Sequence, residues 1–275
     1  MSDAEIAEME EATKYYYPHQ GDREEYIQKG DFYVVSHQGY PTEGRALGYN
    51  LLEGYPVAKK MGFDWSETDV EISQDGVVVC CHDPSFIDAT SGDEIVIADH
   101  TWVELQTYDY HGSILASLDQ IMKCCKELGL GLQIDHITRA KLPYVTPIVK
   151  KYGMENRVLY LVGYALDNPS YAANLISDIQ AFDERAYIML MANASTITPV
   201  ITLANNTVTN YNRVDVTVNI VNFTPDNLVS YLETMNARVN FSCYIVDDVA
   251  TAKQYLPYVN SMTSNIISGY DIFEA

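Results

Sequence analysis

Glu67 and Asp69 are the residues of this chain whose types and spacing most directly indicate chemistry. In a β-strand, side chains two residues apart point to the same face, so these two carboxylates project together. Adjacent carboxylates repel each other unless a positive charge lies between them. Because hard divalent cations prefer oxygen ligands, the pair predicts a metal site.

A turn and a histidine follow the two carboxylates. Asp75-Gly76 is a hairpin turn signal, so the strand expected over 77–82 pairs antiparallel with the strand expected over 64–71. The second strand ends at His82. The hairpin can therefore return His82 to the edge of the sheet where the carboxylates lie.

The elements that must position these residues alternate along the 275-residue chain. Eight strands are expected around residues 32–36, 64–71, 131–137, 157–162, 186–191, 214–221, 240–246 and 261–267. Helices are expected around residues 50–61, 117–128, 142–152, 168–182, 197–205, 224–235 and 249–256. Several strands are apolar on both faces, as in parallel α/β sheets. The pattern predicts a TIM (β/α)8 barrel with a short β-hairpin insertion after strand 2, and a doubly wound sheet is the alternative.

We expect one domain over residues 1–275, with residues 1–30 as an N-terminal helical extension. In a TIM barrel, functional residues gather at the C-terminal ends of the strands. His37 ends the first expected strand, Glu67 and Asp69 lie late in the second, and Asp135 lies late in the third. Three consecutive strands thus deliver polar side chains to one rim.

The composition excludes some classes of partner. A net charge of −21 disfavours nucleic acid, because binding there depends on Lys and Arg that neutralise phosphates. It also disfavours anionic membranes, and the chain has no apolar run long enough for stable membrane insertion. The N-terminus lacks the pattern of a signal peptide, and five cysteines without a disulfide framework favour a reducing compartment, so we expect a cytoplasmic protein. The sequence sets no oligomeric state.

The polar residues also resemble those of the glycerophosphodiester phosphodiesterase family. The resemblance covers residues 32–137 and is carried by these segments: His37-Gln38-Gly39, Glu67-Thr68-Asp69-Val70, Asp75-Gly76, His82-Asp83 and Asp135-His136-Ile137. It implies metal-dependent hydrolysis of a glycerophosphodiester, or a similar small phosphodiester, to a phosphomonoester and an alcohol.

The resemblance also implies roles for individual residues. Glu67, Asp69 and Asp135 would hold one divalent cation, Mg²⁺ or Ca²⁺, and an all-carboxylate set argues against zinc. His37 and His82 would act as general base and general acid, because imidazole titrates near neutral pH. Substrate contacts are expected from Gln38, Arg45 and Asn50.

The chain departs from the family pattern where the family carries positive charge. Gln38 stands in place of an Arg that contacts phosphate, and Ile137 in place of a Lys. These losses favour an alternative, a catalytically weak or inactive barrel that serves as a metal- or ligand-binding protein. His136 follows Asp135 directly, so strand alternation predicts that its side chain faces away from the metal site.

Overall fold

The computed structural model describes residues 33–42, 47–163, 169–208, 213–236 and 238–267. The helical extension expected over residues 1–30 and the loop residue Arg45 lie outside these ranges. The single domain expected over the whole chain stays a prediction.

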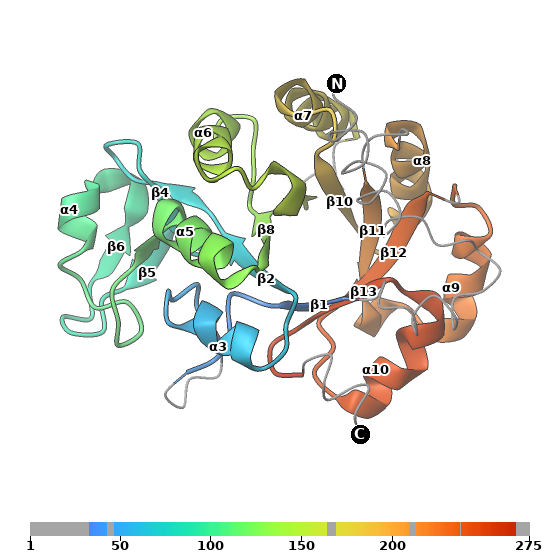
Figure 1. Ribbon diagram of the computed structural model, residues 1–275, viewed down its shortest axis with the longest axis horizontal. Coiled ribbons are helices and arrows are strands. Elements are labelled where there is room, and N and C mark those ends of the chain that lie inside the picture. Colours follow the sequence, from blue (N-terminus) through green and yellow to red (C-terminus); the bar gives the residue numbers. More distant parts are fainter. Residues whose placement is uncertain (1–32, 43–46, 164–168, 209–212, 237, 268–275) are drawn as a thin grey trace.

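The described residues form a closed barrel of eight parallel strands, as the alternating pattern predicts (Figure 1). Around the barrel, the order is β1, β2, β8, β9, β10, β11, β12 and β13, and β13 pairs with β1 to close it. The strands are β1 (Tyr33–Ser36), β2 (Trp65–Asp69), β8 (Gly131–Asp135), β9 (Val158–Val162), β10 (Tyr187–Ala192), β11 (Val214–Asn219), β12 (Val239–Tyr244) and β13 (Ser261–Ser264).

Helices connect successive barrel strands and surround them (Figure 1). They are α3 (Gly54–Lys60), α5 (Leu118–Leu128), α6 (Leu142–Tyr152), α7 (Pro169–Phe182), α8 (Ile197–Thr207), α9 (Pro225–Leu232) and α10 (Val249–Tyr255). The helix expected from residue 50 begins later, at Gly54, so that Pro56 falls in its first turn, where proline is tolerated. Helix α5 begins with a capping box between Ser117 and Gln120 and ends at Gly129 in the left-handed conformation.

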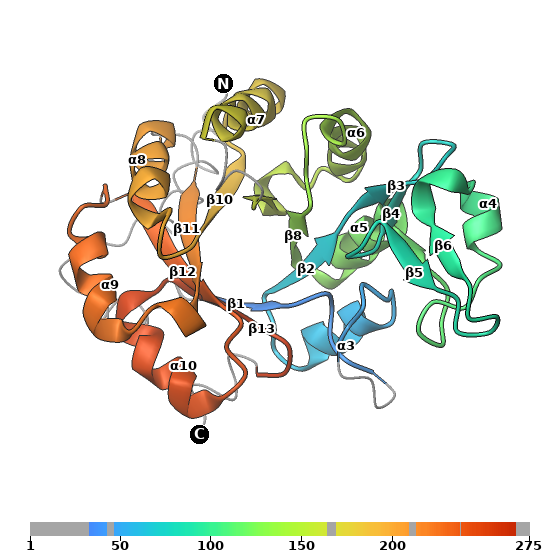
Figure 2. The same ribbon diagram turned by 180° about the vertical axis from the view of Figure 1, so that it is seen from behind.

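The hairpin predicted after strand 2 is present and belongs to a larger insertion between β2 and α5. β3 (Glu71–Ile72) and β4 (Val78–Cys80) pair antiparallel, and β7 (Ala116–Ser117) adds a third strand. A second hairpin, formed by β5 (Ser85–Ile87) and β6 (Glu94–Val96), is followed by a 3₁₀ turn at Ile97–Asp99 and by the short helix α4 (Trp102–Leu105). Figure 2 shows this unit projecting from one side of the barrel. Most of its buried apolar residues, among them Val79, Phe86, Ile95 and Leu105, form a cluster separate from the barrel core, which Leu51 joins from the loop after β1.

Large side chains fill the barrel interior at the N-terminal ends of the strands. Tyr33, Trp65 and Tyr187 form a cluster there, and the aromatic rings of Tyr33 and Trp65 lie 5.5 Å apart. Gly131 allows this packing, since a Cβ atom there would lie 2.3 Å from the Trp65 indole. The interior is therefore packed at this end, and the polar site lies at the C-terminal ends. Among the helices that the structure describes, none has the length and apolar character needed to cross a membrane.

Candidate metal centre and active site

Three carboxylates meet at the C-terminal ends of β2 and β8. The two strands are neighbours, and their register places Asp69 directly beside Asp135. Glu67 lies two residues before Asp69 on the same face of β2, as strand periodicity predicts. Each of the three residues offers one oxygen, and these oxygens all lie within 4.8 Å of one another.

The surroundings of the three carboxylates favour a positive charge between them. Glu67 and Asp69 are each only 2% exposed. The Oε1 atom of Glu67 is buried and accepts no hydrogen bond from the described residues. Burial, followed by the charges of Asp69 and Asp135, raises the pKa of Glu67 well above its usual value. A divalent cation would supply the missing partner for Oε1 and offset the repulsion, so the donor set fits one.

Asp135 experiences the same repulsion. Burial and the charge of Asp69 raise the pKa of Asp135 to about 7, although the backbone N–H of His136 donates to Oδ1 at 2.5 Å and opposes the rise. On the same strand and face, Gln133 is buried, lines the cavity described below, and its Oε1 atom has no hydrogen-bond partner among the described residues. Its amide oxygen is a further potential oxygen ligand that the sequence pattern does not indicate.

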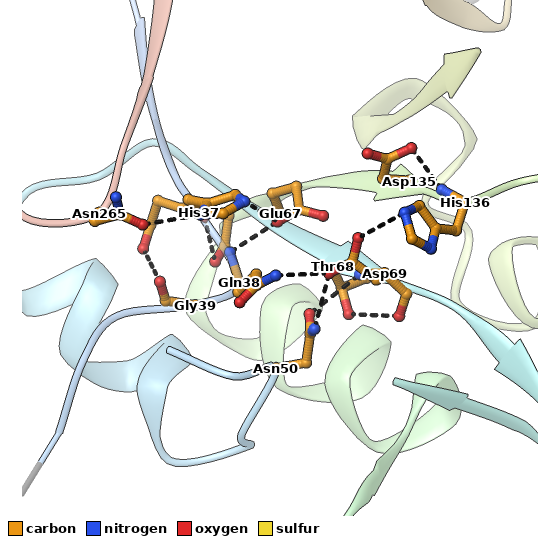
Figure 3. A network of polar contacts seen from close by, with 12 residues as sticks. His37, Gln38, Gly39, Asn50, Glu67, Thr68, Asp69, Asp135, His136 and Asn265 are labelled. Carbon is orange, nitrogen blue, oxygen red and sulfur yellow. Dashed lines mark hydrogen bonds and ion pairs between the residues drawn. The ribbon is translucent and has the colours of Figure 1, made fainter. Parts of the chain in front are cut away.

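Two amide side chains hold the carboxylates in place. Gln38 donates from its backbone N–H to Glu67 Oε2 at 2.8 Å and from Nε2 to Asp69 Oδ2 at 3.2 Å. Asn50 donates from Nδ2 to Asp69 Oδ2 at 2.9 Å and accepts from the Asp69 backbone N–H at 3.1 Å. Both residues have positive φ, which directs the loop after β1 back over the strand ends. Their observed contacts are with the carboxylates (Figure 3), and their role toward substrate stays a prediction.

His37 is oriented by a chain of hydrogen bonds at the point where β13 closes the barrel against β1. Its Nδ1 atom lies 2.8 Å from Asn265 Oδ1 (Figure 3), and Asn265 Nδ2 donates to Asp247 Oδ2 at 2.6 Å. The second contact fixes the amide of Asn265 so that its oxygen faces the imidazole. Neutral His37 therefore carries its proton on Nδ1, and the lone pair on Nε2 faces the site, 3.9 Å from Glu67 Oε2.

His82 reaches the same region from the insertion, just after β4. Its side chain is 52% exposed, and Nδ1 lies 2.9 Å from Asp83 Oδ1. Partial burial lowers the pKa of His82, but the charges of Asp69, Asp83 and Asp135 outweigh this effect and raise the pKa overall. His82 therefore holds its proton more firmly than an isolated imidazole.

The expectation that His136 faces away from the metal site is wrong. β8 ends at Asp135, and His136 has a φ of 57°, so strand alternation no longer applies. Its Nε2 atom lies 3.8 Å from Asp69 Oδ1, and its ring centre lies 4.9 Å from that of His82. Burial lowers the pKa of His136, and the charge of Asp69 partly opposes this shift.

Two cavities share the two predicted catalytic histidines, and one of them adjoins the carboxylates. One, of about 400 Å³, enters the barrel mouth, and its lining includes Glu67, Asp135, Met189 and Met191. The other, of about 590 Å³, lies between the barrel and the insertion, and its lining includes Tyr49, Phe86 and Tyr110. His37 and His82 line both. No Lys or Arg is among the described residues that line either cavity, in agreement with the loss of positive charge at residues 38 and 137.

Without a cation, the protein is expected to lose stability as the pH rises from about 5 to 8. The folded state binds a proton at Asp135 up to a pKa of about 7, whereas the unfolded state releases it near pH 4, so the favourable contribution is lost as the pH rises through about 7. Urea unfolding in EDTA across this pH range measures the slope of the free energy of unfolding against pH. The Asp135→Asn variant should reduce the slope, and added Mg²⁺ or Ca²⁺ should stabilise the protein more at pH 8 than at pH 5. A slope unchanged by Asp135→Asn would contradict this assignment.

Comparison with known proteins agrees with the geometry. Residues 37–128 match the model of the glycerophosphoryl diester phosphodiesterase family. A stretch of 114 residues, 37% of this chain, is 28% identical to YhdW of Bacillus subtilis (strain 168), whose name provisionally assigns it glycerophosphodiester phosphodiesterase activity. That match spans 44% of the length of YhdW, which is less than half of the curated relative.

Solved structures match far more of the chain. A glycerophosphoryl diester phosphodiesterase from Parabacteroides distasonis ATCC 8503 superimposes with a TM-score of 0.68 over 97% of this chain and 90% of that chain, at 13% identity. An Oleispira antarctica phosphodiesterase was solved in complex with the product sn-glycerol-3-phosphate. It superimposes with a TM-score of 0.64 over 85% of this chain and 92% of that chain, at 15% identity. At these identities, the likeness shows a shared fold. Residues 37–128 therefore carry the motif segment of the glycerophosphoryl diester phosphodiesterase family, and the described barrel shares the fold of proteins solved under that name.

Proposed function

We propose that this protein hydrolyses a glycerophosphodiester, or a similar small phosphodiester, to a phosphomonoester and an alcohol, and that the reaction requires a divalent cation. The observation that carries the proposal is the group of three carboxylates beside a cavity lined by His37 and His82. Glu67, Asp69 and Asp135 would hold Mg²⁺ or Ca²⁺, because their donor atoms are all oxygens. The match of residues 37–128 to the family model and the glycerol phosphate product in the Oleispira antarctica structure support this class of substrate.

The two histidines supply the proton transfers. Nε2 of His37 removes the proton from the attacking hydroxyl, either of water or of the substrate, because Asn265 keeps the other ring nitrogen protonated. As the new phosphorus–oxygen bond forms and the bond to the leaving alcohol breaks, His82 donates its proton to the leaving oxygen. The raised pKa of His82 suits it to this role as the acid. A bound cation would polarise the phosphoryl oxygens and offset the negative charge that builds on them.

A second candidate function is a barrel that binds a metal or ligand with little or no catalysis. The cavity linings favour this candidate, since the described residues there include no Lys or Arg to contact phosphate. Loss of a single preorganised electrostatic contact typically costs about 10²–10³-fold in rate. The two candidates differ in whether His37 and His82 transfer protons.

The deciding experiment measures alcohol release from a panel of glycerophosphodiesters that differ in head group. Each is assayed in Mg²⁺, in Ca²⁺ and after treatment with EDTA. We expect turnover of at least one substrate, its loss in EDTA and its recovery when the cation is restored. If the protein binds Mg²⁺ or Ca²⁺ by calorimetry yet turns over no member of the panel, the binding function replaces the enzymatic one.

A further inference from the structure

We propose that Asp69, His82 and His136 form a second metal site, which takes a transition-metal ion such as Zn²⁺ and thereby inhibits hydrolysis. The donor atoms of these three residues lie within 4.8 Å of one another. The site shares only Asp69 with the three-carboxylate group. The inhibition rests on the proposed function, whereas the binding of the ion does not.

The two oxygens of Asp69 face different neighbours. Oδ2 accepts hydrogen bonds from Gln38 and Asn50, while Oδ1 lies 3.8 Å from His136 Nε2 (Figure 3). The imidazole of His82 completes the group from the insertion, with its ring centre 4.9 Å from that of His136. Small side-chain movements would bring the three donors to bonding distance of about 2.0–2.2 Å from one ion.

The donor set differs in chemistry from the three carboxylates. Two imidazole nitrogens and one carboxylate oxygen suit Zn²⁺, Co²⁺ and similar ions, whereas Mg²⁺ and Ca²⁺ prefer oxygen ligands. Histidines that bind metals usually direct their second ring nitrogen to a carboxylate or carbonyl oxygen. His82 has Nδ1 2.9 Å from Asp83 Oδ1, and His136 has Nδ1 4.0 Å from Glu71 Oε1. The contact of His82 with Asp83 is within hydrogen-bond distance, whereas Glu71 lies near His136 and pairs with Lys141.

Occupancy of this site is incompatible with the proposed chemistry. Because His82 Nδ1 is held by Asp83, Nε2 is the nitrogen available either to bind the ion or to carry the proton for the leaving alcohol. An ion on Nε2 prevents that proton transfer. A transition-metal ion is therefore an inhibitor of the Mg²⁺- or Ca²⁺-dependent reaction.

Two variants separate the sites by binding alone. His136→Asn removes a donor from the mixed site, and Glu67→Gln removes a donor from the carboxylate site. In isothermal titration calorimetry, we expect His136→Asn to weaken Zn²⁺ binding at least about 10-fold while the affinity for Mg²⁺ or Ca²⁺ stays unchanged. We expect Glu67→Gln to weaken the binding of Mg²⁺ or Ca²⁺ while the affinity for Zn²⁺ stays unchanged. Visible absorption of bound Co²⁺ gives a second readout that detects the imidazole ligands. His100→Asn, at a partly buried histidine outside both groups, is the matched control.

Turnover tests the inhibition. With Mg²⁺ or Ca²⁺ in excess, Zn²⁺ should inhibit the wild type and His100→Asn at the same concentration, and at least about 10-fold more should be needed for His136→Asn. Equal Zn²⁺ affinity in the wild type and His136→Asn would overturn the site. Loss of Zn²⁺ binding in His136→Asn with unchanged inhibition would overturn the inhibitory role. Absence of turnover in every protein would count against the proposed function and leave the calorimetric result decisive for the site.

Discussion

Replacing His37 with alanine is expected to lower kcat by about 10²–10⁴-fold, the usual contribution of a general base. The side chain is partly exposed at the end of β1, and its two polar contacts are with Asn265 and Glu67, so the fold should tolerate the change. Steady-state kinetics on the best substrate of the panel measures the effect, and thermal unfolding confirms that the variant is folded. Turnover within about threefold of the wild type would remove His37 from its assigned role.

Asn265 provides a control that tests how His37 works. Asn265→Ala leaves the imidazole in place but removes the acceptor that fixes its protonated nitrogen, so a smaller loss of about 10-fold is expected. Because Asn265 acts through His37, the double variant should be no slower than His37→Ala alone. Losses that multiply in the double variant would show that Asn265 acts independently of the base.

Replacing Glu67 with glutamine is expected to weaken Mg²⁺ or Ca²⁺ binding by more than about 100-fold and to abolish measurable turnover at ordinary cation concentrations. The change keeps the shape of the side chain and removes one of three ligand charges. Burial and the neighbouring carboxylates already raise the pKa of Glu67 in the cation-free protein, so glutamine resembles the protonated form. The free energy of unfolding in EDTA should therefore be equal to or higher than that of the wild type.

The matched control for this variant is Asp119→Asn. Asp119 is an acidic residue on the outer face of α5, where it pairs with Lys151. The Asp119→Asn substitution should leave cation affinity and turnover unchanged, because Asp119 lies outside both candidate metal-binding groups. If Glu67→Gln binds the cation as tightly as the wild type, the three-carboxylate site is wrong, whatever its effect on turnover.

The barrel and its carboxylate group follow from short-range patterns in the sequence. Apolar strands alternating with helices require helices on the outside of a parallel sheet, and strand periodicity places Glu67 and Asp69 on one face. Asp135 joins them because consecutive strands of the barrel are neighbours in space. These features need only the local conformation of each strand and the order of the elements.

The remaining features of the site depend on conformations and contacts that local patterns do not specify. The orientation of His136 depends on a left-handed residue directly after a strand, and only the tertiary structure determines where β8 ends. Asn265 contacts His37 across 228 residues of sequence, through closure of the barrel. A signal for Asn265 does exist, since the end of the last barrel strand must lie beside the end of the first. Arg45, expected to contact substrate, lies outside the described residues.

The insertion between β2 and α5 can vary in sequence, by selection or by design, largely independently of the barrel. It carries His82 and part of one cavity wall, yet most of its buried residues pack into a cluster of their own. Residues that line this cavity can therefore vary on the insertion while the strand ends that carry the three carboxylates stay the same. Exchanging the insertion between relatives is a route to a different cavity wall on an unaltered barrel.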